Sequence, residues 1–249
     1  MFSLQIIGLR GLPDVSPGDN LVSLIADGVR RESVDVNDGD VFVVTQKIVS
    51  KASGRMVRLA DVEPSAIAED WASRVEKDPR LIEVILRESA RIVRMDRGII
   101  VAETKHGFVC ANAGVDGSNV PGGYVTLLPE HPDDDACKIR EGLTATLGSR
   151  VAVLICDTFG RPWRLGQVNV AIGISGLKPL ADYRGSRDAS GVFLQSTMIA
   201  VADELASAAE LVMGKLHRVP VAIIKGVVDH EGEGAAHDLI RPGHEDMFR

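Results

Sequence analysis

The sequence lacks the motifs that mark the common nucleotide-binding and hydrolytic folds. It contains no GxxxxGK[ST] segment, which excludes a P-loop enzyme, and no GxGxxG after a strand-like run, which argues against a dinucleotide-binding Rossmann unit. The HExxH motif of zinc peptidases and the GxSxG turn of serine hydrolases are also missing. If this chain handles nucleotides, it does so by an uncommon route.

Long apolar runs, paired cysteines and a positive charge excess are missing too. No apolar run approaches the roughly 20 residues of a membrane span. Residues 1–7 lack the basic region of a secretory signal. The three cysteines, Cys110, Cys137 and Cys156, show no CxxC spacing, and buried reduced thiols are their simplest account. The net charge of −7 argues against a broad phosphate-backbone footprint. We therefore expect a cytoplasmic protein with neither membrane nor nucleic acid as a partner.

The order of apolar runs and turn signals indicates an α+β fold. The chain has 249 residues, of which 45% are hydrophobic, and can bury a full core. Strand-like runs are found at 2–8, 41–44, 99–103, 108–112, 151–156, 167–174 and 219–225. Helices are expected at 21–31, 64–76, after Pro79, from Asp133 and at 197–213. There is no steady βαβ rhythm, so we expect a mixed or antiparallel sheet with flanking helices.

The same patterns give no firm domain boundary. We expect a single domain over residues 1–249, and the loop at 114–135 is the best candidate for a seam. Residues 229–249 are rich in glycine, histidine and acids and are expected to form a mobile tail.

Two segments place a carboxylate among small residues directly after an apolar run. They are residues 112–119 (NAGVDGSN) and residues 156–161 (CDTFGR). Two strand ends of this kind, brought together, can hold one or two divalent cations against a phosphate. Asp116 and Asp157, with the Thr158 hydroxyl, suit Mg²⁺ or Mn²⁺ better than zinc. The alternative is that each aspartate only makes a turn, because Asp readily bonds its own backbone.

Basic residues lie close to both segments. Lys47 and Lys51 follow a buried strand and, in extended chain, share a face with Val49. They suit phosphate oxygens. The alternative is that they lie on an edge strand, where lysines prevent pairing with another chain. Arg161 is close enough to Asp157 to neutralise a phosphate or to form a structural ion pair with it.

Two further features complete the candidate site. Arg10 precedes a Gly11-Leu12-Pro13 corner that can bring backbone amides to the same anion, and Asn119 offers an amide to a base or a phosphate. The acids of the helix at 197–213, which include Asp203, Glu204 and Glu210, are expected on the surface.

These segments, in this order, resemble the coenzyme F420-0:L-glutamate ligase family, the γ-glutamyl ligases of deazaflavin cofactor synthesis. The similarity extends to about residue 228. The matching stretches are 11–13 (GLP), 43–55 (VVTQKIVSKASGR), 112–119 (NAGVDGSN), 157–161 (DTFGR), 171–178 (AIGISGLK) and 202–215 (ADELASAAELVMGK). The chain has no nitroreductase-like domain of the kind fused to many bacterial members, so it resembles a stand-alone ligase.

The resemblance implies a GTP-dependent reaction. The γ-phosphate of GTP would pass to the lactyl carboxylate of coenzyme F420-0, and the amine of L-glutamate would attack the acyl phosphate to give an amide. A further glutamate can be added through a γ-linkage. The resemblance also implies a family-specific α+β fold, an intertwined homodimer, a need for Mn²⁺ or Mg²⁺, and a response to K⁺.

The resemblance also assigns roles to residues of this chain. Asp116, Asp157 and Thr158 match metal ligands. The GTP-binding positions match Arg10, Gly11, Leu12, Pro13, Gln46, Lys47, Lys51 and Asn119, together with the segment 213–220 that begins Met213-Gly214-Lys215. In catalysis, Lys51 and Arg161 would share the phosphoryl charge with the metal on Asp116 and Asp157.

The chain departs from the family pattern at two places. Lys215 stands where archaeal members carry Gln or Glu, and a protonated lysine cannot ligate a hard cation. It either substitutes a charge for one metal or contacts phosphate directly. Gln46-Lys47 replaces a Ser-Thr-like pair.

Two other classes of function remain open at this point. A metal-dependent phosphohydrolase can be built on the same two carboxylates. A non-catalytic module that binds a nucleotide or a deazaflavin would need the same basic residues. Only the ligase would form a new amide.

Overall fold

The centre of the molecule is a five-stranded mixed sheet with strand order β1-β12-β2-β8-β9. The structure is a computed structural model that describes residues 3–228 and 230–246. The strands are β1 Gln5–Gly8, β2 Val41–Thr45, β8 Ala152–Arg161, β9 Arg164–Ser175 and β12 Val221–Lys225. β2 and β8 are parallel, whereas β1–β12, β12–β2 and β8–β9 are antiparallel. The expected mixed sheet in an α+β fold is therefore confirmed.

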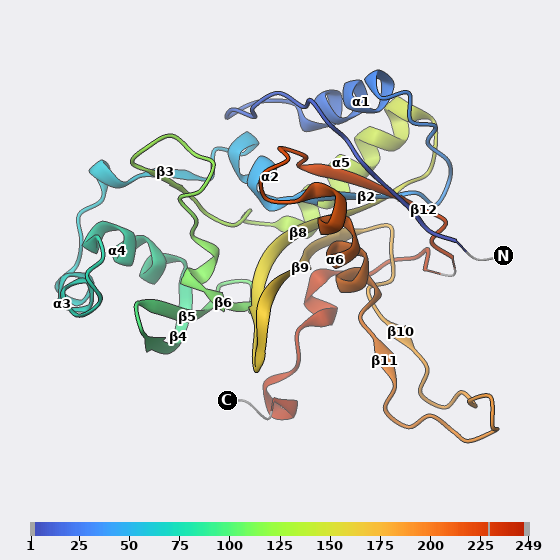
Figure 1. Ribbon diagram of the computed structural model, residues 1–249. Coiled ribbons are helices and arrows are strands. Elements are labelled where there is room, and N and C mark those ends of the chain that lie inside the picture. The colour runs from blue at the N-terminus through green and yellow to red at the C-terminus, as the bar shows by residue number, and fades with distance from the viewer. Residues whose placement is uncertain (1–2, 229, 247–249) are drawn as a thin grey trace.

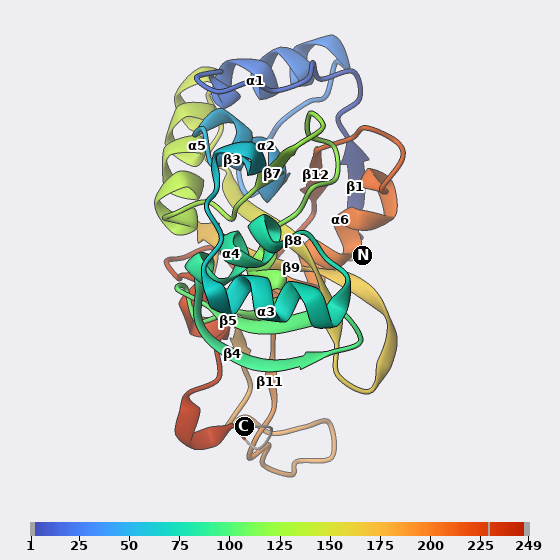
Figure 2. The same cartoon turned by 90° about the vertical axis from the view of Figure 1, so that its left-hand side faces the viewer.

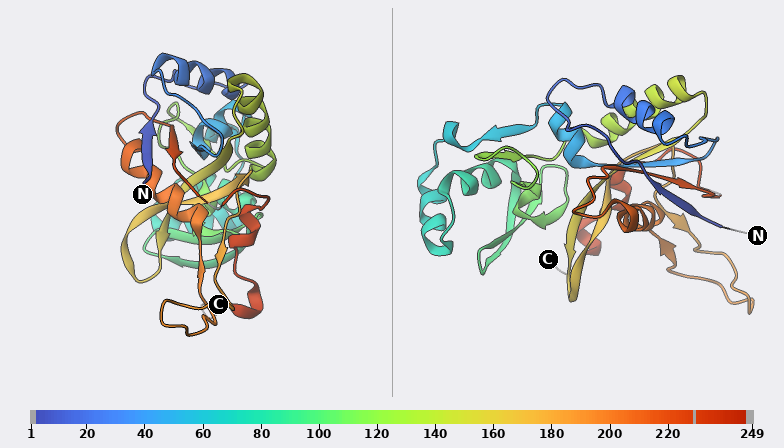
Figure 3. Two further views of the ribbon diagram at one scale, coloured as in Figure 1. Left: turned by 90° about the vertical axis from the view of Figure 1, so that its right-hand side faces the viewer. Right: turned by 45° about the horizontal axis from the view of Figure 1, so that its top comes forward.

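Helices cover both faces of this sheet (Figures 1 and 3). On one face lie α1 Leu21–Arg31, α2 Gln46–Ala52 and α5 Pro132–Leu147, and on the other lies α6 Val201–Met213. Residues of β2 alternate between the two cores: Phe42 and Val44 pack with the first group of helices, and Val41 and Val43 with α6. This alternation is the period of two of a strand that is buried on both sides.

Residues between α2 and α5 form a separate lobe with its own hydrophobic cluster, which includes Ile82, Ile85, Ile100 and Val125 (Figure 2). The lobe contains α3 Ala66–Val75, α4 Pro79–Glu88, β3 Met56–Arg58, β4 Ser89–Asp96, β5 Ile99–Thr104, β6 Val109–Ala111 and β7 Tyr124–Thr126. Its sheets are β4-β5-β6 and β3-β7. The strand-like runs expected at 99–103 and 108–112 are confirmed as β5 and β6, which pair antiparallel as a hairpin. The single domain over 1–249 and the seam at 114–135 stay predictions.

Two outlying segments complete the chain. A long arm between β10 Ala181–Asp182 and β11 Met198–Ile199 projects from the sheet (Figure 1). The chain after residue 229 returns to the core, where the backbone N–H of Ala236 donates to Asp133 Oδ1 at 3.0 Å. The mobility expected for 229–249 stays a prediction; residues 1–2, 229 and 247–249, which belong to the predicted N-terminal strand and the tail, lie outside the described residues.

Local sequence signals account for several elements. The predicted helix at 21–31 is confirmed, and its cap Asn20 accepts a hydrogen bond from the backbone N–H of Ser23 at 3.1 Å. All three cysteines are free thiols, with Cys110 and Cys156 buried. Burial raises the pKa of the Cys110 thiol to about 12, so this thiol is unreactive.

Two predicted boundaries are wrong. Residues 46–51 are helical and not extended, because Ile48 and Val49 pack into the core together with Ala52, which lies four and three residues further on, while the Ser50 hydroxyl donates to Gln46 Oε1 at 2.9 Å. The helix expected from 197 begins at Val201, since Met198–Ile199 pairs with β10.

Gly173 tests the packing of α5 on β9. A Cβ at Gly173 would lie 2.4 Å from the carbonyl oxygen of Pro132, whereas a Cβ at Gly160 in β8 would meet nothing within 4 Å. We expect Gly173→Ala to lower the free energy of unfolding by about 2 kcal/mol through overpacking. Gly160→Ala is the matched control and should change it by less than about 0.5 kcal/mol. Urea denaturation of both variants measures the difference, and equal stabilities would contradict the proposed close contact.

Candidate active site

The site lies at the edge of the sheet where the parallel strands β2 and β8 end side by side. Thr45 of β2 is in register with Cys156 of β8. Parallel strands bring the residues that follow them to one edge of the sheet. Lys47, in the first turn of α2, and Asp157, the next residue of β8, therefore meet there. The sequence suggested that the strand ends at Asp157. This is wrong, because β8 continues to Arg161 in a long hairpin with β9.

Asp116 reaches this edge from the separate lobe. The Lys47 ammonium donates to Asp116 Oδ2 and, at 2.6 Å, to the Ser118 hydroxyl. The backbone N–H of Ser118 donates to Asp116 Oδ1 at 2.7 Å. Burial pushes the pKa of Asp116 upward, but the hydrogen bonds from Lys47 and Ser118 outweigh it, and the net pKa is lowered. Asp116 is therefore a carboxylate at neutral pH.

Asp157 is in a different electrostatic state. Burial raises the pKa of Asp157 to about 6, against the lowering effect of a hydrogen bond from the backbone N–H of Thr158. The charge of Asp116 raises this pKa further, while Lys47 and Lys215 lower it. The two carboxylates thus repel each other across one site. With a pKa of about 6, Asp157 is mostly ionised at neutral pH, and a bound cation would stabilise this buried negative charge.

Thr158 belongs to a ring of polar contacts between β8, β9 and α6. Its hydroxyl donates to Asn169 Oδ1 at 2.6 Å, and Asn169 Nδ2 donates to Glu210 Oε2 at 3.0 Å. The Lys215 ammonium, just after α6, donates to the Thr158 hydroxyl and lies 3.4 Å from Glu210 Oε1. Asn169 and Glu210 were not singled out as site residues from the sequence.

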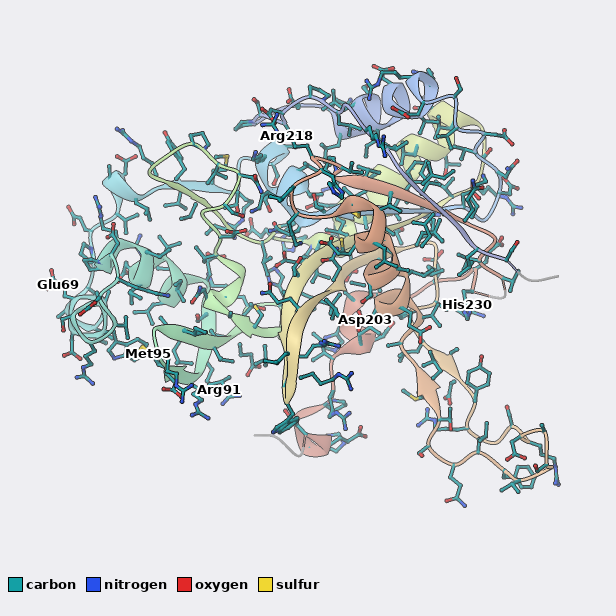
Figure 4. All side chains as sticks on the ribbon, viewed as in Figure 1. Glu69, Arg91, Met95, Asp203, Arg218 and His230 are labelled. Carbon is teal, nitrogen blue, oxygen red and sulfur yellow. The ribbon has the colours of Figure 1, made fainter. Side chains whose placement is uncertain are left out.

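The prediction that the acids of α6 lie on the surface is wrong for two of them. Asp203 and Glu210 are not free surface groups: Asp203 Oδ1 accepts the backbone N–H of Ala171 at 2.9 Å, and burial raises its pKa. Figure 4 labels Asp203 where α6 lies against the sheet. Helical spacing could have predicted this position of the two acids. Residues 203, 206, 210 and 213 lie on one face of the helix, and Ala206 and Met213 on that face are buried. Glu204 is exposed, as expected.

The nucleotide-binding segments expected from the resemblance converge on the same edge. Residues 10–13 follow β1, and the backbone N–H of Leu9 donates to the Val221 carbonyl at 2.9 Å. The N–H of Thr45, just before Gln46 and Lys47, donates to the Pro220 carbonyl at 2.9 Å. Segment 213–220, whose Arg218 is labelled in Figure 4, thus lies between them.

Individual residues of these expected nucleotide-binding segments differ in which of their groups a ligand can reach. The Met213 side chain is buried in the α6 core, so only its backbone can meet a ligand. Gly11 has a φ of +64° and accommodates the corner after β1. Lys51 lies one helical turn after Lys47 on the same face of α2. Asn119 is exposed in the loop directly after Ser118.

Arg161 lies apart from the carboxylates. It ends β8 at the tip of the β8–β9 hairpin, four residues beyond Asp157, a separation of about 13 Å in extended chain. Its Nη2 donates to the Leu165 carbonyl at 2.8 Å. The structure therefore does not bring Arg161 to Asp116 and Asp157, and its catalytic role stays a prediction.

The donor set fits a divalent cation on one side of the site. Asp116 and Asp157 are hard oxygen donors, and burial, together with the charge of Asp116, raises the pKa of Asp157. The Thr158 hydroxyl is different, because Lys215 and Asn169 already use it. Residues 3–228 and 230–246 contain no group of three or more His, Cys, Asp or Glu side chains arranged to hold a metal ion. A metal here would therefore also need oxygens from substrate or water.

Comparison with known proteins identifies the family. The model of the F420-0:gamma-glutamyl ligase family matches residues 10–226. A coenzyme F420:L-glutamate ligase of Methanothermobacter thermautotrophicus is 47% identical over 249 residues, covering 99% of both chains. Proteins of the same name from Methanopyrus kandleri and Archaeoglobus fulgidus are 48% and 39% identical, over 94% and 99% of this chain and 93% and 96% of their own lengths.

These findings define the class and then the family. The protein is an enzyme, a ligase that forms amide bonds. The chain belongs to the F420-0:gamma-glutamyl ligase family. Across the described residues there is no helix with the length and apolar character needed to cross a membrane.

The raised pKa of Asp157 predicts that this residue destabilises the metal-free fold. Unfolded Asp ionises near its ordinary value of 3.8, whereas folded Asp157 holds its proton to about pH 6. Folding stability is therefore lost as pH rises from about 4 to 6, and the deficit stays constant above that range. We expect Asp157→Asn to be more stable than the native chain by on the order of 2 kcal/mol at pH 7.5.

Thermal and urea unfolding with a chelator present, at pH 4.5 and 7.5, measure this effect. The advantage of Asp157→Asn should shrink at the lower pH. Equal stabilities at pH 7.5 would show that Asp157 is not strained by its surroundings.

Proposed function

We propose that this enzyme joins L-glutamate to the lactyl carboxylate of coenzyme F420-0, with GTP as the phosphoryl donor, and that it can add a further glutamate through a γ-linkage. The names of its relatives and the family match support the deazaflavin and glutamate as substrates. GTP, the divalent cation and K⁺ are part of the proposal through the resemblance in sequence. We also propose, from the family match, that the enzyme is located in the cytoplasm.

One observation carries the proposal: two carboxylates and two ammonium groups meet at the sheet edge where three predicted nucleotide-binding segments converge. The ammonium groups of Lys47 and Lys215 act on Asp157, and Lys47 also holds Asp116. Lys51 follows one turn later on α2. Such a site offers positive charge and hard oxygen donors without any P-loop, which suits a triphosphate.

The chemistry needs charge stabilisation and no side-chain nucleophile. A carboxylate oxygen of the acceptor attacks the γ-phosphorus of GTP, and GDP leaves. The glutamate amine then attacks the acyl carbon, phosphate leaves, and the nitrogen loses a proton. Lys47 and Lys51 would hold phosphate oxygens during the first step, and a divalent cation on Asp116 and Asp157 would neutralise charge on the migrating phosphoryl group.

The decisive test is amide formation. Purified protein is incubated with the deazaflavin acceptor, L-glutamate, GTP, Mn²⁺ or Mg²⁺, and K⁺, and products are followed by mass spectrometry. We expect a mass step for each glutamate added, with GDP and phosphate formed in parallel. Asp157→Asn should reduce the rate by about 100-fold or more, because phosphoryl charge would go uncompensated.

The control is Asp134→Asn, an exposed aspartate on α5 that should leave the rate unchanged. The unfolding measurements described above show whether Asp157→Asn is folded, and a folded variant without activity has lost the chemistry and not the fold. Phosphate release without glutamate and without an amide would support a phosphohydrolase instead. Ligand binding without any turnover would support a binding module.

We also propose a homodimer, supported by exposed apolar side chains on the projecting parts of the chain. Leu165 at the hairpin tip is 99% exposed, and Val192 and Phe193 on the long arm are 62% and 54% exposed. Single exposed apolar residues are ordinary, but these three lie on segments that extend away from the core (Figure 1).

Light scattering should therefore give twice the chain mass of 26.7 kDa. Val192→Glu should shift the protein toward monomer, because an interface would bury the new charge. Ile67→Glu on α3, a residue 60% exposed in the separate lobe, is the control and should leave the mass unchanged. A monomer for the native chain would exclude the proposal.

A further inference from the structure

Lys215 occupies the Thr158 side of the site. It follows Gly214, which ends α6 with a positive φ of 56° but an extended ψ of 163°, and therefore outside the left-handed helical conformation. This turn directs Lys215 back toward β8, where its ammonium bonds to the Thr158 hydroxyl and pairs with Glu210. Its side chain is 60% exposed, so the ammonium lies at the mouth of the site.

The hydrogen bonds around Lys215 have one consistent direction. An ammonium only donates, so the Thr158 oxygen accepts from Lys215 and gives its own proton to Asn169 Oδ1. The Asn169 amide then donates to Glu210, whose other carboxylate oxygen faces Lys215. Each group has the partner that its chemistry requires, and the ring is closed. A divalent cation on Thr158 would have to break it.

The charge of Lys215 also acts on the catalytic carboxylate. It lowers the pKa of Asp157, opposing the larger effect of burial. Glu210, which pairs with Lys215, balances part of the lysine charge within the ring. An ammonium carries three N–H groups, and within the described residues two of them have the partners named above, which leaves one for a phosphate oxygen.

We propose that the Lys215 ammonium is a built-in cation that replaces a divalent ion at Thr158, so that each site takes up a single divalent cation, on Asp116 and Asp157. The proposal rests on the function proposed above, in that it concerns how the same site neutralises a triphosphate. Lys215 supplies a fixed positive charge from the Thr158 side. A divalent ion next to it would be repelled and would find the Thr158 oxygen already used.

Counting bound Mn²⁺ tests this without turnover. Equilibrium dialysis followed by metal analysis, at pH 7.5 with a saturating non-hydrolysable GTP analogue, should give one Mn²⁺ per chain for the native protein. Lys215→Gln removes the charge and offers a neutral amide oxygen that can ligate a hard cation, and it should raise the number to two. Lys215→Arg keeps a positive charge and should stay at one.

Lys138→Gln, an exposed lysine on α5, is the matched control and should also stay at one. Two Mn²⁺ per native chain would overturn the proposal, even if no Lys215 variant folds. An unchanged number in a folded Lys215→Gln variant would overturn it as well. The outcome is separate from that of the amide assay: a protein that makes no amide but gains one Mn²⁺ in Lys215→Gln would refute the proposed reaction and retain the built-in cation.

Discussion

The parallel pairing of β2 with β8 is the constraint on which the site depends. It is the one parallel pairing recorded within the main sheet of the described chain. Its register sets Thr45 beside Cys156, and the chain then turns into α2 on one side and continues as β8 on the other. Lys47 and Asp157 become neighbours as a consequence, although 109 residues lie between them along the chain. Asp116 and segment 213–220 are then added around this pair.

The surroundings of the site stabilise the negative charge of Asp116 but not that of Asp157. Asp116 is well compensated by Lys47 and Ser118, whereas Asp157 relies on one backbone N–H and on more distant lysines. A fold selected only for stability would replace such a carboxylate with a neutral group. Retaining it makes physical sense if a bound cation and a phosphate complete the site. The strain on Asp157 in the metal-free protein and the affinity for a cation then have the same electrostatic origin.

Local patterns predicted much of the fold and part of the site. Asn20 before an amphipathic run defined the start of α1, and the apolar run at 41–44 defined β2. Asp116, Asp157 and Lys47 were predicted because their residue types suit phosphate and metal chemistry. Asn169 and Glu210 were missed, because each lies in a segment that otherwise has the pattern of core packing. Their role is visible only when β9 and α6 are placed side by side.

By itself, the sequence determined the class of fold, the family and the chemical nature of the site, because composition, local capping and short motifs act over a few residues. The tertiary structure decided which groups neutralise one another. It made 46–52 a helix, placed Arg161 at a distal tip and directed Lys215 to Thr158. These outcomes depend on contacts between segments far apart in the chain, where packing outweighs local preference.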